Sequence, residues 1–196
     1  MNRNREIIVL KAAYILMILV IFILPFFSDD GYSIIKHTTS QLGAQLTPNA
    51  WIMNFTFVSL GAGTVIAGWN RLKGYMFHRL FLLLFGISLI LTAFFNHAPI
   101  NPHIQFNPEE DGWHSYFAYS TGLSFTIFAI ANAFISYRRI DRGLALITGI
   151  FATIVSILMS EVNQFMGILQ RLMFIICFGW IVYNFSKALP QTEHQD

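Results

Sequence analysis

Six long apolar segments constrain this chain more than any other feature of its sequence. A helix needs roughly 20 apolar residues to cross the hydrocarbon core of a bilayer, and about 17 suffice. Apolar residues make up 55% of the chain and charged residues only 11%, which is outside the usual composition of soluble domains. The segments are residues 7–27, 51–69, 80–95, 114–135, 144–160 and 168–183. We therefore predict an all-α integral membrane bundle of six transmembrane helices that forms a single domain over residues 1–196.

The basic residues predict the direction of the bundle. Ten of the twelve precede residue 12, lie between residues 70 and 80 or 137 and 143, or follow residue 183; the exceptions are Lys36 and Arg171. Because lysine and arginine concentrate in cytoplasmic loops, both termini are predicted to be cytoplasmic, in a multi-pass protein of the cell membrane. Segment 7–27 is not followed by a small-residue cleavage site, so we expect it to stay as an anchor. The net charge of +2 is too small to indicate nucleic acid binding.

The acidic residues show the opposite sorting, which the positive-inside rule does not demand. Six acids fall on the predicted outer side: Asp29, Asp30, Glu109, Glu110, Asp111 and Glu161. Four of the six histidines lie there as well: His37, His97, His103 and His114. This concentration of titratable side chains predicts a functional site at the outer mouth of the bundle.

The first outer loop carries apolar residues at roughly helical spacing. Ile34, Ile35 and Leu42 are part of this pattern, while His37 and Ser40 lie on its polar side. A short helix at the membrane interface would fit, and it would make His37 and Ser40 neighbours. Two interpretations stay open: an ordinary amphipathic loop helix, or one that contributes these two residues to a site.

The sequence "NPEEDGWHSYFAYS" places three acids and a histidine at the start of the fourth apolar segment. Asp111 is a candidate N-cap, and an acid there also favours the positive end of the helix. Asp111 and His114 are three residues apart, so they would share a helical face, and a carboxylate can orient an imidazole as a metal ligand. Capping with solvated acids, and half of a site that includes His97, are both consistent with this pattern.

Arg171 lies about one turn into the last apolar segment, with Gln170 beside it. A charge inside hydrocarbon costs about 2.5 to 3.5 kcal/mol, so Arg171 is expected to face protein or water and to pair with an outer acid, most simply Glu161. A structural ion pair is one interpretation, and an anchor for an anionic head group is the other.

These residues divide into three candidate roles. The catalytic candidates are Ser40, Asp111, His114 and Glu161; the substrate-binding candidates are Arg171 and Gln170; the candidate metal ligands are His37, His97 and His114. Imidazole and carboxylate ligands suit zinc or a similar divalent ion. The single cysteine, Cys177, excludes an intrachain disulfide and a cysteine-based zinc site.

Several short motifs together resemble the domain-of-unknown-function 998 family of multi-pass integral membrane proteins. They are "TTSQLGAQLTPNAWIMN", "NHAP", "DGWHSYFAYS", "GILQRLMF" and "GWIVY". The resemblance supports Ser40 in a serine-leucine-glycine element, His114 at the start of a span, and Arg171 early in the last span. Gln170, and not an acid, precedes that arginine, so the resemblance does not identify a carboxylate partner. It implies the fold and the choice of residues but no reaction.

Two functions follow as hypotheses. The first is a membrane-embedded, metal-dependent hydrolase or transferase that acts on a lipid or lipid-linked substrate at the outer leaflet, with Ser40 or a metal-bound water as the attacking group. The alternative is a non-catalytic lipid or small-amphiphile binding or transport protein that holds the head group with Arg171. Membrane lipid is the expected partner in both, and the sequence gives no sign of a protein partner.

Overall fold

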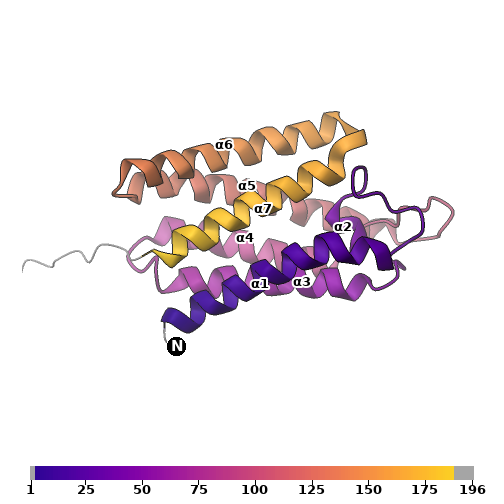
Figure 1. Cartoon of the computed structure of the whole chain (residues 1–196), viewed down its shortest axis with the longest axis horizontal. Coiled ribbons are helices and arrows are strands. Elements are labelled where there is room, and N and C mark those ends of the chain that lie inside the picture. The colour runs from indigo at the N-terminus through magenta and orange to yellow at the C-terminus, as the bar shows by residue number, and fades with distance from the viewer. Residues whose placement is uncertain (1–2, 188–196) are drawn as a thin grey trace, which may run out of the picture.

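The computed structural model of the protein describes residues 3–187, and over these residues it is helical (Figure 1). The α-helices are α1 (Arg3–Ile23), α2 (Thr39–Leu42), α3 (Ala50–Trp69), α4 (Met76–Phe94), α5 (Pro108–Ile135), α6 (Arg139–Glu161) and α7 (Met166–Ser186). Two short 3₁₀ helices are η1 (Leu24–Phe27) and η2 (Asn163–Phe165). Six helical segments are long and apolar enough to cross a membrane, which confirms the predicted class of fold.

The six long helices form a closed ring with antiparallel neighbours. In chain order α1 packs on α3, α3 on α4, α4 on α5, α5 on α6 and α6 on α7, and α7 returns to α1. The start of α1 and the end of α7 therefore lie at the same end of the bundle (Figure 1). We call this the terminal end. The opposite end, which we call the loop end, carries segments 28–49, 95–107 and 162–165.

The structure moves the start of the fourth span and changes its cap. Helix α5 begins at Pro108, and the side chain of Asn107 accepts hydrogen bonds from the backbone N–H groups of Glu109 (3.0 Å) and Glu110 (3.3 Å). Proline suits the first helical position because it lacks an N–H that would need a partner there. Asn107 is therefore the N-cap, and the prediction that Asp111 caps this helix was wrong.

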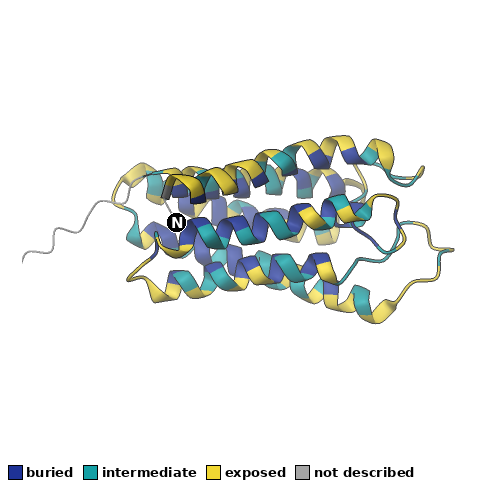
Figure 2. Cartoon of the chain, turned by 90° about the horizontal axis from the view of Figure 1, so that it is seen from below, coloured by how far each residue is buried: buried dark blue, intermediate teal, exposed yellow. Residues whose placement is uncertain are grey.

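The outward faces of the long helices are apolar. Exposed side chains include Ile15 on α1 (59%), Phe134 on α5 (80%) and Ile147 on α6 (64%), and Figure 2 shows exposed positions along the outer surface of the bundle. In water such an apolar surface would cause aggregation, whereas the hydrocarbon chains of a membrane solvate it favourably. The bundle therefore has the surface of a multi-pass membrane protein.

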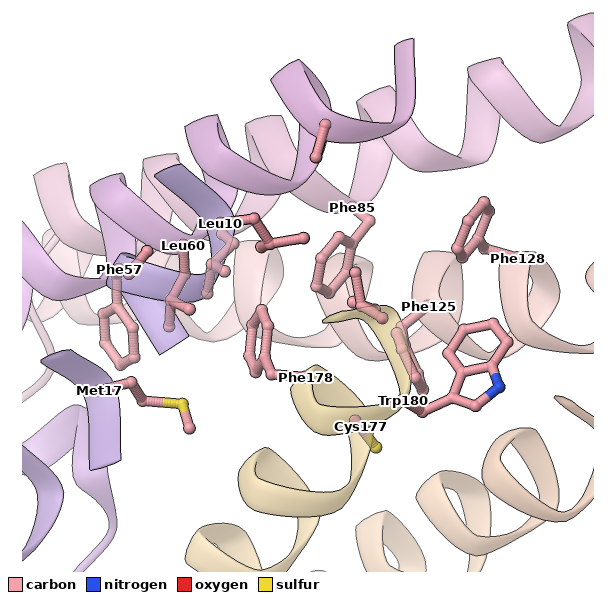
Figure 3. Packing of buried hydrophobic residues seen from close by; sticks show 14 of the residues in the cluster. Leu10, Met17, Phe57, Leu60, Phe85, Phe125, Phe128, Cys177, Phe178 and Trp180 are labelled. Atoms are coloured by element: carbon pink, nitrogen blue, oxygen red, sulfur yellow. The ribbon is translucent and has the colours of Figure 1, made fainter. Parts of the chain in front are cut away.

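Aromatic rings fill the interior between α4, α5 and α7. The ring of Phe85 lies 5.6 Å from that of Phe125 and 5.7 Å from that of Phe178, as centroid distances (Figure 3). Trp180 adds an edge-to-face contact with Phe125 at 6.0 Å. Rings at these separations attract each other beyond the effect of burial alone, so they hold the three helices together near the middle of the bundle.

Gly167 lets the first loop dock directly on the start of α7. The backbone N–H groups of Gly167 and Ile168 donate to the carbonyl oxygen of Ile35, at 2.9 Å and 3.2 Å. A methyl group on Gly167 would lie no more than 2.9 Å from the carbonyl oxygens of Ile34, Ile35 and His37. The loop therefore satisfies N–H groups of the first turn of α7, which have no partner within the helix.

We expect Gly167→Ala to destabilise the protein by at least about 2 kcal/mol, because three backbone carbonyls would have to move. The measurement is the free energy of unfolding in mixed detergent and SDS micelles. Gly112→Ala is the matched control, since a methyl group there meets nothing within 4 Å and alanine favours a helix. Equal stability of the two variants would contradict the tight docking of the loop on Gly167.

Candidate functional site

A cavity of about 1040 Å³ lies on the side of the bundle, between α5, α6 and α7. Helices α3 and α4 form its back wall, and Ser40 of α2 contributes at the loop end. Seven aromatic rings line it, those of Tyr116 and Tyr119 and of five phenylalanines: Phe57, Phe85, Phe125, Phe174 and Phe178. From Gln170 to Cys177, both in its wall, α7 rises about 10 Å, so the cavity extends well into the bundle.

The polar groups of the cavity wall are hydroxyls and amides. They include Ser40, Tyr116, Thr121, Ser160, Asn163 and Gln170, and none of the described lining residues is Asp, Glu, Lys, Arg or His. The side-chain carbonyl oxygen of Gln170 accepts from both the backbone N–H and the hydroxyl of Thr39, each at 2.6 Å. Since that N–H fixes which atom is the oxygen, the Gln170 side-chain NH₂ is left without a partner among the described residues. Ser40 Oγ likewise makes no hydrogen bond within the described chain.

Arg171 points away from this cavity and into the first loop. Its Nε donates to the carbonyl oxygen of Ile21 at 3.0 Å, and one terminal nitrogen lies 2.9 to 3.0 Å from the carbonyl oxygens of Ile34, His37 and Gly167. The other terminal nitrogen donates to the Tyr32 hydroxyl at 2.7 Å. The side chain is only 2% exposed. Arg171 therefore joins α1, the first loop and α7 through backbone oxygens.

The predicted pairing of Arg171 with Glu161 was wrong. Glu161 ends α6 with an exposed side chain, and no acid forms an ion pair with Arg171 in the part of the chain that the structure describes. Carbonyl oxygens that approach from three segments replace the carboxylate, because a guanidinium has five N–H donors and can satisfy several acceptors at once. Since Arg171 does not line the cavity, the structure gives it no direct contact with a molecule bound there.

The first loop around Arg171 is more irregular than its apolar spacing predicted. Only Thr39–Leu42 is helical, and Thr38 with Gln41 forms a capping box at its start. His37 precedes this helix, so His37 and Ser40 are not neighbours on one helical face. The ring of His37 instead lies 5.4 Å from that of Tyr32, and its Nδ1 accepts from the backbone N–H of Ser33 at 2.9 Å.

Burial and nearby cations determine the protonation of this loop. Burial lowers the pKa of His37, and the positive charges of Lys36 and Arg171 lower it further. Burial also raises the pKa of the Tyr32 hydroxyl, although Arg171 opposes this shift. His37 is therefore neutral near pH 7, with Nδ1 occupied as an acceptor and the hydrogen on Nε2. In this state neither ring nitrogen offers a free lone pair to a metal.

Two of the three acids at the start of α5 hold the turn that follows α4. The carboxylate of Glu110 accepts from the backbone N–H of Asn96 at 2.8 Å, and that of Asp111 accepts from Ala98 at 2.7 Å. Asp111 also lies 3.2 Å from Nδ1 of His97. These contacts explain why acids gather at the start of α5. The carboxylates of Glu110 and Asp111 accept hydrogen bonds from backbone N–H groups of the connection between α4 and α5.

His114 lies beneath the same turn and is buried, with 2% exposure. Its Nδ1 is 2.7 Å from the carbonyl oxygen of Phe95 and 3.0 Å from that of Thr92, so Nδ1 carries the hydrogen. The Nε2 atom is buried without a partner among the described residues. The ring of His97 is 5.1 Å away, as a centroid distance. The structure thus brings Asp111, His97 and His114 together, and Thr92 links them to the cavity because it also lines the wall.

The predicted metal ligands do not converge as a set. His97 and His114 are adjacent, whereas His37 is engaged with Tyr32 and Ser33 in the first loop. Over residues 3–187 no group of three or more His, Cys, Asp or Glu side chains could hold a metal ion. Since zinc sites use at least three protein ligands, the residues present do not fit such an ion.

Sequence reasoning missed Tyr32, Asn107 and the α5–α6 wall of the cavity. Tyr32 had no visible link to Arg171 because 139 residues separate them. The signal for Asn107 was present, since asparagine followed by proline is a common start of a helix. The hydroxyl-bearing residues of α5 and α6 carried no motif, and only the packing of the helices shows that they face a cavity.

The fold and this site together define a multi-pass membrane protein with six spans and a lateral cavity. We call the loop end of this cavity, lined by Ser40, Ser160, Asn163 and Gln170, its mouth. Residues 12–184 match the family described as Protein of unknown function (DUF998), and the chain belongs to this family. No curated protein and no solved structure matches the chain.

We expect Arg171→Leu to destabilise the protein by at least about 3 kcal/mol, because carbonyl oxygens from three segments lose a charged donor. Arg171→Lys should recover only part of this loss, since one ammonium cannot reach all of these oxygens. Glu161→Gln should change the free energy of unfolding by less than about 0.5 kcal/mol. If Glu161→Gln lowered the free energy of unfolding as much as Arg171→Leu, the result would support an ion pair between the two residues and contradict this arrangement.

Proposed function

We propose that the protein binds a membrane lipid or a similar small amphiphile in the lateral cavity. The observation that carries this proposal is the composition of the cavity wall: Ser40 of α2 and Gln170 of α7 are polar residues at the loop end, and rings such as that of Phe178 line the deeper part. A cavity that is mostly apolar with a few convergent polar groups is the usual form of a small-molecule site. The polar part of the amphiphile would lie at the loop end, and its hydrocarbon chain would extend toward Phe178.

We further propose that the loop end faces the outside of the cell membrane. The support is the sorting of the basic residues, which gather at the terminal end in the connections around Arg71 and Arg138 and near both chain ends. The cavity mouth would then take its ligand from the outer leaflet.

This orientation is tested with single cysteines in a Cys177→Ala background. Gln164→Cys at the loop end should react with a membrane-impermeant thiol reagent added to intact cells, and Tyr137→Cys at the terminal end should react only after the cells are permeabilised. Both positions are exposed, so folding should be unaffected. Reaction of Tyr137→Cys from outside would invert the proposed topology.

A second candidate is a hydrolase or transferase that acts on the lipid in this cavity. The observation that favours it is Ser40, whose hydroxyl lies in the wall without a hydrogen-bond partner in the described chain, while His114 lies behind Thr92 of the same wall. A serine nucleophile needs a base within hydrogen-bonding reach, although such contacts often tighten only when substrate binds. The residues that the structure describes do not fit a zinc site, so this candidate includes no step through a metal ion.

Lipid binding is tested with lipids that carry a photoreactive diazirine on an acyl chain. After irradiation we expect labelled peptides from the cavity wall, such as those with Met173 and Cys177, as well as from the lipid-facing side of α1. Gly122→Phe should reduce the ratio of cavity to α1 labelling about 10-fold, or about 1.4 kcal/mol, because Gly122 borders the cavity and open space surrounds its Cβ position.

Gly112→Phe is the control, since it adds the same ring to the same helix outside the cavity wall. It should leave the labelling ratio unchanged. Cavity labelling that is no greater than α1 labelling, or that survives Gly122→Phe, would overturn the binding proposal. Lipid recovered with a changed mass after incubation would support the enzymatic candidate, and unchanged lipid would support binding alone.

A further inference from the structure

We infer that the amphiphile of this cavity carries an uncharged head group that accepts hydrogen bonds, such as the hydroxyl and ester groups of a diacylglycerol. The inference rests on the proposed binding function and names the chemical class of its ligand. It depends on which side chains face the cavity and on where the nearby charged groups are held.

The cavity mouth is neutral although charged residues are close in sequence. Gln170 lines the wall, whereas Arg171 next to it is held by the carbonyl oxygens of Ile21, Ile34 and His37. Ser160 lines the wall, whereas Glu161 after it is outside the lining. Arg171 is the cation that lies nearest to a wall residue in the sequence, and its donors are therefore already hydrogen-bonded to oxygens of the protein.

Asp111 and His114, near the start of α5, are also engaged elsewhere. Asp111 binds the backbone of Ala98 and approaches His97, and Nδ1 of His114 faces the carbonyl oxygens of Thr92 and Phe95. None of these charged or titratable side chains belongs to the described lining of the cavity. A bound phosphate would consequently lose its water without gaining a cation, and burial of an unpaired charge is strongly unfavourable.

The polar atoms that do face the cavity suit an uncharged acceptor. The side-chain NH₂ of Gln170 offers donors, because its carbonyl oxygen is already bound to Thr39. The hydroxyl of Ser40 can donate or accept. Ester carbonyl and hydroxyl oxygens would form hydrogen bonds with both groups. A head group without such oxygens would bind more weakly, because it would leave these donors buried and unpaired.

The deeper wall suits hydrocarbon chains of varied shape. Besides the aromatic rings, the wall contains Met173 beyond Gln170 on α7, and Met159 and Met166 nearer the loop end. Methionine is unbranched and flexible, so such a wall can adapt to bent, unsaturated chains. The cavity therefore combines a neutral, hydrogen-bonding mouth with an adaptable apolar interior.

The test compares two probes that differ only in the phosphate: diacylglycerol and phosphatidic acid with the same diazirine-bearing unsaturated acyl chains. The full-length protein is reconstituted in phosphatidylcholine vesicles that contain one probe at equal mole fraction. We expect labelling of the cavity peptides, relative to α1 peptides, to be about 10-fold higher with diacylglycerol. Equal or stronger labelling with phosphatidic acid would overturn the inference.

A charge added at the mouth provides an independent variant. Asn163 lines the cavity, and its neighbour Gln164 does not, and both side chains are exposed. Asn163→Lys should raise phosphatidic acid labelling of the cavity about 10-fold, whereas Gln164→Lys adds the same charge outside the wall and should leave it near the level of the unmodified protein. Equal effects of both substitutions would mean that general surface charge, and not the cavity mouth, sets the preference.

The outcomes separate this inference from the binding function. Absence of cavity labelling with either probe would overturn the proposed function itself. Cavity labelling that is equal for both probes would agree with the binding function but contradict the inference that the ligand has an uncharged head group.

Discussion

The hydrogen bonds of the Arg171 guanidinium are the interactions on which the structure of the loop end depends. A cation at this depth of a membrane helix is expensive unless it has partners, and Arg171 finds them in the carbonyl oxygens of Ile21, Ile34, His37 and Gly167 and in the hydroxyl of Tyr32. These oxygens belong to α1, the first loop and α7. One side chain thus fixes three segments, and the close docking of the loop is possible because Gly167 has no side chain.

This anchored loop decides the character of the cavity. Because the loop is fixed on α7, Thr39 reaches the Gln170 side chain, and Ser40 takes its place in the wall. The same network withdraws the positive charge of Arg171 from the mouth, while the turn after α4 engages Glu110 and Asp111. The result is a mouth of hydroxyls and amides over an aromatic interior, although charged residues flank it in sequence.

The sequence predicted the six spans because the hydrocarbon core sets both the length and the composition of a crossing helix. It also singled out Arg171, because a charge inside hydrocarbon is costly, and His97, Asp111 and His114, because titratable residues gather at one end of the predicted bundle. Their partners were harder to predict. Arg171 was expected to bind Glu161 because opposite charges attract, but backbone oxygens carry no residue-specific signal, so their convergence on a guanidinium cannot be read from side-chain types. Asp111 was a candidate cap because an acid suits the positive end of a helix, but Asn107 occupies that position.

The sequence by itself determined that this chain is a membrane protein with six apolar spans, and which polar residues lie near the ends of these spans. Hydrophobicity and local spacing are properties of short segments, and they suffice for these conclusions. Only the tertiary structure decided that Gln170 faces the cavity while Arg171 faces the loop, and that hydroxyl-bearing residues such as Thr121 and Ser160 line one wall. The physical reason is that helical spacing fixes which side chains share a face, whereas the packing of neighbouring helices and loops decides whether that face lines a cavity, contacts a loop or faces lipid.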